Sequence, residues 1–169
     1  MMQIGVMSDT HNNLSNLLYA LAYFRDREIT TIIHCGDLTD FELISHFYGF
    51  QLIYLFGNVD ADTGVIRKRV KALNAENFAG LVFRGQLGEA WVAATHSHIE
   101  GQLMALVQEQ RYNWIFHGHT HQRRDEVVQE ARIVNPGALG GLKKGPRSFC
   151  LVDLDASSVD SIVIPERLS

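Results

Sequence analysis

Five short polar stretches of this chain each follow an apolar run. They are Asp9-Thr10-His11, Gly36-Asp37, Gly57-Asn58, Thr95-His96-Ser97-His98 and Gly118-His119-Thr120-His121. With His98 set aside, they offer two carboxylates, one amide oxygen and four imidazoles, all hard or borderline metal ligands. This set is large enough to hold two divalent ions side by side, and paired ions are a common means of attacking phosphate esters. The pattern therefore predicts a dinuclear metal site.

The spacing within these stretches favours convergence of the side chains. In extended or loop backbone, residues i and i+2 point the same way, so the pairs Asp9/His11 and His119/His121 can each direct two ligands toward one place. Glycine permits tight turns and close backbone approach, and it stands directly before three of the candidate ligands. These glycines are Gly36, Gly57 and Gly118. Each piece alone is common, but the ordered set is specific.

The first half of the chain alternates apolar runs with helical patterns, an order that favours a largely parallel sheet. We expect strands at Gln3–Met7, Thr31–His34 and Leu52–Phe56. We expect helices through Leu14, Leu17, Leu18, Leu21 and Ala22, over Phe41–Tyr48 and over Ile66–Leu73. Asn12 or Asn13 is the expected N-cap of the first helix.

The second half changes character. Leu81–Phe83 and Trp91–Ala94 suggest a hairpin around Gly85-Gln86-Leu87-Gly88, and Leu103, Met104, Leu106 and Val107 fit a helix. Further strands are expected at Trp114–His117, Arg132–Val134, Phe149–Leu154 and Ser161–Ile164. The short loops between these late strands favour antiparallel pairing. Two sheets packed face to face, with helices outside, are the simplest architecture that results.

Each candidate ligand follows one of these expected strands. Asp9 and His11 follow the first, Asp37 the second and Asn58 the third, while His96, His119 and His121 follow two later strands. In α/β sheets, binding sites form where loops converge at the carboxyl ends of strands. Ligands far apart in the sequence are therefore expected to meet in space.

Length and composition are those of a globular protein. The 169 residues are expected to form a single domain, 1–169, with 46% hydrophobic and 20% charged residues. The first residues lack the basic start and long apolar region of a secretory signal, and no apolar run approaches the ~20 residues of a membrane span. Cys35 and Cys150 lie in apolar surroundings and are expected to be buried free thiols. We therefore expect a cytoplasmic protein with no membrane partner.

The charge balance argues against a long nucleic acid as partner. The net charge is −4, and no basic face is evident. Lys143, Lys144 and Arg147 form one small basic cluster, which is a solvated loop or a contact to substrate phosphate. Two ionised carboxylates against two divalent ions would leave the site at about +2, so it can attract a phosphate anion.

Together these motifs resemble the calcineurin-like metallophosphoesterases, especially the small single-domain phosphodiesterases of the YfcE type. The resemblance runs from Asp9 through Asn135-Pro136-Gly137, which is similar to a loop flanking the site in this subgroup. It implies a single calcineurin-like phosphoesterase domain and a four-layer α/β/β/α sandwich of two mixed β-sheets flanked by helices. It also implies a phosphoric ester hydrolase acting on small phosphodiesters.

The resemblance also assigns roles to residues. Asp9, His11 and His121 are similar to the ligands of one ion, and Asn58, His96 and His119 to those of the other, with Asp37 bridging both. It implies that water bridging the ions attacks phosphorus, and that Asn58 contacts the phosphate. The family leans toward manganese, whereas the donors alone suit Mn, Fe, Co, Ni and Zn equally.

One departure concerns the leaving group. Many larger members have a histidine after the asparagine, which helps the leaving group depart, but this chain has Val59. His98 either contacts substrate, protonates the leaving group or is a plain loop residue. The missing histidine lowers the case for a phosphomonoesterase or nuclease on small substrates. A non-catalytic interaction scaffold, like a retromer subunit of this fold, is the alternative from another class. The oligomeric state is open, and a homo-oligomer is compatible with the sequence.

Overall fold

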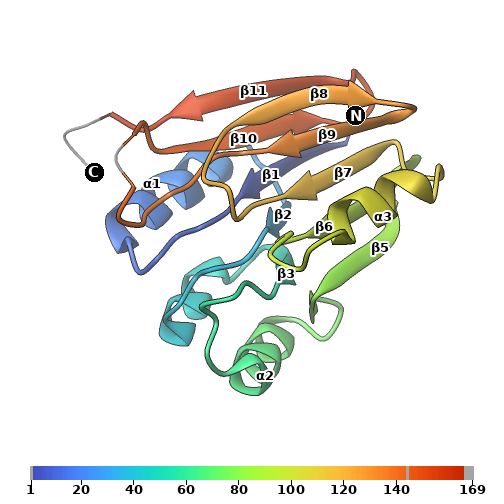
Figure 1. The fold of residues 1–169 in the computed structure, drawn as a ribbon. Coiled ribbons are helices and arrows are strands. Elements are labelled where there is room, and N and C mark those ends of the chain that lie inside the picture. The colour runs from blue at the N-terminus through green and yellow to red at the C-terminus, as the bar shows by residue number, and fades with distance from the viewer. Residues whose placement is uncertain (1, 144, 166–169) are drawn as a thin grey trace.

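The computed structural model describes residues 2–143 and 145–165 and has the predicted mixed α/β architecture (Figure 1). The helices are α1 (Leu14–Arg25), the 3₁₀ helix η1 (Phe41–Phe47), α2 (Thr63–Leu73) and α3 (Gln102–Gln108). The strands are β1 (Gln3–Met7), β2 (Thr31–His34), β3 (Gln51–Leu55), β4 (Phe78–Gly80), β5 (Val82–Leu87), β6 (Ala90–Thr95), β7 (Trp114–His117), β8 (Arg124–Val128), β9 (Ala131–Asn135), β10 (Ser148–Asp153) and β11 (Ser158–Val163). Among the described residues, no helix is long and apolar enough to cross a bilayer.

The strands form two mixed sheets. The first has the order β11-β10-β1-β2-β3-β4, and the second has the order β5-β6-β7-β9-β8. β1 to β4 are mutually parallel, as the alternating first half predicts, whereas β10 pairs antiparallel with both β1 and β11. The carboxyl ends of β1, β2 and β3 therefore open at one edge of the first sheet.

Alternation of side chains along the strands separates three layers of core. On β2, Ile33 packs between the sheets, whereas Ile32 packs toward the helices on the outer face. On β7, Phe116 likewise faces the first sheet, and Ile115 faces α3. Figure 1 shows α1 and α2 with the first sheet and α3 with the second. The predicted arrangement of two sheets with helices outside is confirmed.

The predicted antiparallel pairing of the late strands is only partly right. β5 pairs antiparallel with β6, and β8 with β9, but β6, β7 and β9 are parallel to one another. The chain passes from β6 to β7 through α3, and a crossover of this kind joins parallel strands. This parallel run matters because it brings the ends of β6 and β7 to the same edge.

Two further local expectations need correction, and two strands were not predicted. The hairpin turn is Gly88-Glu89, because Gly85 to Leu87 continue β5 and Gly88 adopts the positive φ that such turns require. β8 was not predicted, because its charged sequence is that of an exposed edge strand. β4 was not predicted either, because it has only three residues. The helix over 41–48 is 3₁₀ in form and ends at Phe47.

The first sheet and α1 are in unusually close contact at Gly5. A Cβ at this position would lie 2.5 Å from the Phe24 ring, which is fully buried. We predict that Gly5→Ala lowers the free energy of unfolding by about 1–3 kcal/mol, since overpacking forces neighbours off their rotamers. Urea denaturation in the presence of a chelator measures this.

Gly64→Ala is the matched control. A Cβ at Gly64 in α2 would meet only Asp62 Oδ1, at 3.4 Å, so alanine should leave stability unchanged or raise it by ~0.5–1 kcal/mol. Equal stability of the two variants would contradict the close packing at Gly5.

Candidate metal centre

The structure brings the predicted ligands to one place, above the ends of β1, β2, β3, β6 and β7. The loop after β1 runs beside the loop after β2: Asp9 N donates to Gly36 O at 2.9 Å, and His11 N to Asp37 O at 3.0 Å. These backbone hydrogen bonds extend the sheet beyond its last residues. They fix the relative position of the two candidate carboxylates.

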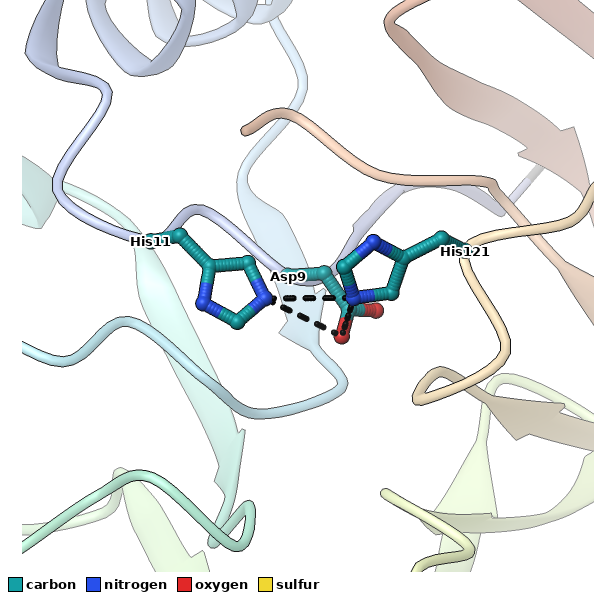
Figure 2. Close-up of side chains that lie close together, drawn as sticks. All are labelled: Asp9, His11 and His121. Atoms are coloured by element: carbon teal, nitrogen blue, oxygen red, sulfur yellow. Dashed lines mark hydrogen bonds and ion pairs between the residues drawn. The ribbon is translucent and has the colours of Figure 1, made fainter. Parts of the chain in front are cut away.

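Asp9 is fully buried, and its two carboxylate oxygens have different surroundings. Oδ2 accepts hydrogen bonds from Ser8 Oγ at 2.6 Å and from His119 N at 3.1 Å. Oδ1 accepts no hydrogen bond and lies 3.1 Å from His121 Nε2 and 3.8 Å from His11 Nε2. Figure 2 shows the two imidazoles and the Asp9 carboxylate directed toward one another.

The second carboxylate, Asp37, is held in the same way. Its Oδ1 accepts from Val59 N at 3.0 Å, while its Oδ2 lies 3.2 Å from His96 Nε2 and 3.9 Å from His11 Nε2. His96 Nδ1 donates to Cys35 O at 2.6 Å, so its Nε2 is the nitrogen left for the site. The same Nε2 lies 3.2 Å from Asn58 Oδ1. Asp37 Oδ2 thus faces both His11, a candidate ligand of one ion, and His96, a candidate ligand of the other.

These distances fit ligands around shared cations. The Nε2 atoms of His11 and His121 lie 3.2 Å apart. Two ligands at about 2.1 Å from one ion, at right angles or tetrahedral, lie about 3.0–3.4 Å from each other. An unpaired, buried carboxylate oxygen that faces two imidazole nitrogens is costly without a cation between them. The donors present therefore fit divalent metal ions.

His119 and His98 complete the cluster of rings. The His119 ring lies edge-on to His96, with centroids 5.1 Å apart, and His98 lies 5.4 Å from His96 and 6.4 Å from His119. His98 Nδ1 is buried and has no hydrogen-bond partner. All of the predicted ligands, and His98, thus belong to one cluster.

The pKa shifts follow from burial and from this mutual contact. Burial alone would raise the pKa values of Asp9 and Asp37, but hydrogen bonds and nearby imidazoles lower both overall. Burial would lower the pKa of His96, yet the Asp37 carboxylate raises it overall. Burial lowers the pKa of His11 and His119. The lowered pKa values favour ionised carboxylates at Asp9 and Asp37 and neutral rings at His11 and His119, which are the forms that bind metal ions.

Much of the site rests on backbone in the left-handed region, where few non-glycine residues lie. The candidate ligands there are Asp9 (φ 53°), His11 (43°), Asp37 (59°), His119 (68°) and His121 (61°). Each such residue costs of order 1–2 kcal/mol, so the surrounding hydrogen bonds must hold it in place. This turn geometry aims the ligand side chains inward.

Two of the predicted glycines are required by close approach. A Cβ at Gly57 would lie 1.9 Å from Asp37 Oδ1, and one at Gly118 would lie 2.0 Å from Ser8 Oγ. The prediction that glycine precedes these ligands for steric reasons is confirmed.

Asp60 connects the loop of Asp37 with the loop of Asn58 through hydrogen bonds to their backbones. Its Oδ2 accepts hydrogen bonds from Gly57 N at 2.8 Å, from Asp37 N at 3.2 Å and from Tyr54 Oη at 2.8 Å. Its Oδ1 accepts from Thr39 N at 3.1 Å. Asp60 therefore orients the loops that carry Asp37 and Asn58, with help from Tyr54, which no sequence pattern marks for this part.

Asn135 fixes the loop that carries His119 and His121. Its Nδ2 donates to Gly118 O at 2.9 Å and to Thr120 Oγ1 at 3.1 Å, and its Oδ1 accepts from Gly137 N at 2.9 Å. The Asn-Pro-Gly stretch therefore flanks the site, as the resemblance implied. Beyond it, a pocket of about 610 Å³ opens beside the imidazoles, lined by His11, Asn12, Asn13, His121, Gly141, Leu142 and Lys143.

Comparison with known proteins identifies the family. The model of the calcineurin-like phosphoesterase superfamily domain matches residues 2–157. Phosphodiesterase MJ0936 of Methanocaldococcus jannaschii is 30% identical over 165 residues, which span 96% of this chain and 99% of that protein.

Two solved structures are informative. An archaeal phosphodiesterase superposes with a TM-score of 0.91 at 30% identity, covering 96% of this chain and all of the other. A Vps29 variant from Entamoeba histolytica has a TM-score of 0.70 at 16% identity, covering 97% of this chain and all of the other. The second likeness shows the fold alone.

The buried His34 behind the site yields a prediction about pH. Its Nδ1 accepts from Gly36 N at 3.2 Å, its Nε2 lies 2.8 Å from Thr10 Oγ1, and burial lowers its pKa from 6.5 to about 4. An unfolded chain takes up this proton first, so the free energy of unfolding falls as pH drops from 6.5 toward 4. His34 should contribute ~1.4 kcal/mol per pH unit to that slope.

Urea denaturation at several pH values, with chelator present, measures this slope. We expect both His34→Gln and His34→Phe to lose the His34 contribution. The glutamine, which keeps polar atoms for Thr10 and Gly36, should be the more stable of the two at pH 7. Slopes parallel to that of the unmodified protein would show that His34 is not buried in its neutral form.

Proposed function

The chain belongs to the calcineurin-like phosphoesterase superfamily, and we propose that it hydrolyses phosphate diesters at a centre of two divalent metal ions. It is a phosphoric ester hydrolase by family and by its relative named phosphodiesterase. The observation that carries the proposal is Asp37 Oδ2, which lies 3.2 Å from His96 Nε2 and 3.9 Å from His11 Nε2. One carboxylate oxygen between two groups of ligands is the arrangement that a shared pair of ions requires.

We assign the ligands in two groups. One ion would be held by Asp9, His11 and His121, the other by Asn58, His96 and His119, and Asp37 would serve both. One cluster of donor atoms, that of Asp9, His11 and His121, supports the first ion, and a second cluster joins Asp37 and His96 with Asp9 beside it. The nitrogen and oxygen donors suit manganese, our proposed ion, as well as nickel, iron, zinc and cobalt.

The chemistry divides between the ions and the chain. When bound, the ions would lower the pKa of the attacking water and neutralise charge on the phosphoryl oxygens. The chain's own residues fix the geometry, because Ser8 and Val59 each hold one oxygen of a carboxylate and leave the other for the centre. We propose that the Asn58 amide nitrogen donates a hydrogen bond to the phosphate.

His98 is proposed to contact the substrate. Burial, together with repulsion between the protonated rings of His98 and of its neighbours His96 and His119, lowers the pKa of His98. A neutral ring is a weak proton donor, so this favours a hydrogen-bonding role over general-acid catalysis. Val59 has no titratable group, so the leaving group would depart without help from that position.

The alternatives are a non-catalytic metal-binding scaffold and a phosphomonoesterase or nuclease on small substrates. The likeness to Vps29 rests on 16% identity and bears on the fold alone. The complete donor set, with one free oxygen on each carboxylate, favours hydrolysis over the scaffold. The missing histidine at position 59 favours diesters with good leaving groups over monoesters.

The proposal extends to the setting of the enzyme. Cys35 and Cys150 are both buried free thiols, as was predicted from sequence, which is usual in a reducing compartment. We propose a cytoplasmic enzyme that acts on small phosphodiesters.

The shared role of Asp37 predicts an asymmetry between two variants. Asp37→Ala should weaken both metal sites by more than the ~10–100-fold typical of losing a residue that only supports a ligand. His121→Ala should empty mainly the site of Asp9 and His11. Elemental analysis after equilibrium dialysis counts the ions bound in each variant.

Asp160→Ala, which removes an exposed carboxylate on β11, is the matched control and should bind as much metal as the unmodified protein. Full metal content in folded Asp37→Ala would contradict the bridging role. Unchanged stoichiometry in His121→Ala would contradict its placement as a ligand.

Hydrolysis assays test the function itself. Metal-free protein, supplied with Mn²⁺, Ni²⁺, Zn²⁺ or Mg²⁺, should cleave bis(p-nitrophenyl) phosphate faster than p-nitrophenyl phosphate. Among aryl and alkyl diesters, rates should fall as the leaving-group pKa rises, because nothing at Val59 donates a proton. No turnover from folded, metal-loaded protein would favour the scaffold, and equal rates across leaving groups would reveal a proton donor.

A further inference from the structure

A second pocket adjoins the candidate metal centre on the side of His121. It has a volume of about 440 Å³. Its lining combines the loop after β7 with the loop that follows Asn-Pro-Gly, and includes Arg123, Lys143 and Arg147. His121 and Lys143 also line the larger pocket beside His11, so the two pockets share a wall. The second pocket, which we call the cationic pocket, therefore lies directly beside the pocket at the candidate metal centre.

The charge of the cationic pocket is opposite to that of the chain. Three of its lining residues are cationic and none is a carboxylate, although the chain carries a net charge of −4. Other arginines pair with acids: Arg69 with Glu42, Arg84 with Glu109, Arg124 with Glu126 and Arg132 with Asp125. Within residues 2–143 and 145–165, Arg123 and Lys143 have neither an ion pair nor a hydrogen bond. Both are exposed donors with no anion supplied by the described chain.

Arg147 gives the pocket a fixed wall. Its guanidinium donates to Gly140 O and, at 2.6 Å, to Gly141 O. A Cβ at Gly141 would lie 2.9 Å from the His121 ring and 3.0 Å from the His11 ring, so this loop lies against the proposed ligands. Gly140 N also donates to Asp9 O at 2.8 Å. The backbone of Gly140 and Gly141 therefore contacts both Arg147 of the cationic pocket and the proposed ligands of the metal centre.

We propose that the cationic pocket binds a second phosphate of the substrate, so that the preferred substrates are phosphodiesters carrying a further phosphate group. This inference rests on the proposed function, because it takes the scissile diester to lie at the metal centre. Arg123 and Lys143 would meet the second phosphate with charge-assisted hydrogen bonds. The guanidinium of Arg147 is held by two carbonyls, so it adds positive potential to the pocket without contacting the second phosphate directly. Salt screens this potential only in part.

A matched pair of chromogenic esters tests the proposal. Thymidine 5′-(p-nitrophenyl phosphate) and its 3′-phosphorylated form have the same diester and leaving group, and differ only in the second phosphate. We expect the metal-loaded protein to show a KM about tenfold lower for the 3′-phosphorylated ester, with similar kcat, the size of effect that hydrogen bonds to a charged group supply. The preference should shrink as ionic strength rises.

Variants assign this preference to the pocket. Arg123→Gln combined with Lys143→Gln should bring the two KM values within about twofold, by raising the KM of the 3′-phosphorylated ester, while the protein still binds its metal ions. Lys68→Gln, an exposed cation on α2, is the matched control and should keep the full preference. A preference that survives in the double variant, or that is absent from the unmodified protein, overturns the proposal.

An equilibrium measurement separates this inference from the proposed function. Calorimetry should show that thymidine 3′,5′-bisphosphate binds the metal-loaded protein about tenfold more tightly than thymidine 5′-phosphate, and the double variant should lose this difference. If neither ester is hydrolysed with any metal, the proposed function fails, and this binding difference still decides the pocket. If the plain ester is hydrolysed but the two nucleotides bind equally, the second-phosphate site alone is wrong.

Discussion

The candidate site depends on holding two ionised carboxylates, those of Asp9 and Asp37, close together and out of contact with solvent. Asp9 is fully buried and Asp37 nearly so, and both carboxylates face the His11 imidazole. Like charges at such burial repel and lose their hydration, a cost that only cations or many donors can offset. The fold supplies backbone and hydroxyl donors to one oxygen of each carboxylate and directs the other oxygen into the cluster. The arrangement is poised for positive charge, which is why metal ions are the natural occupants of the proposed centre.

The two mixed sheets make this arrangement possible. Parallel pairing of β1, β2 and β3 places Asp9, Asp37 and Asn58 on neighbouring loops, and the crossover through α3 brings the end of β6 beside that of β7. Left-handed backbone at the ligands then turns the side chains inward at a local cost. Asp60 and Asn135 hold these turns through several backbone hydrogen bonds each, so a strained site rests on a well-paired frame.

Most of the strands, and the polar residues that cluster beyond their ends, could be predicted from the sequence, because both depend on local pattern. β1, β2 and β7 have the predicted bounds, since each is a short apolar run that ends at a polar stretch. β8 was not predicted because the sequence of a charged edge strand is similar to that of a loop. The direction of each carboxylate oxygen could not be predicted from the sequence, because it depends on distant partners. Asp9 Oδ2, for example, accepts a hydrogen bond from the backbone of His119, 110 positions away. The loop from Gly140 was missed for the same reason: its contact with Asp9 exists only in the folded chain.

The group of Asp9, His11 and His121 joins the two sheets, since its first two members follow β1 and its third follows β7 (Figure 2). An ion bound there would act as a cross-link between residues far apart in the chain, and its free energy of binding would add to the cohesion of the sandwich. Because the unfolded chain has no such site, the melting temperature would rise with the concentration of free metal. Heat resistance and metal supply would then be coupled, and a cell starved of the ion would hold a protein more open to proteolysis as well as less active.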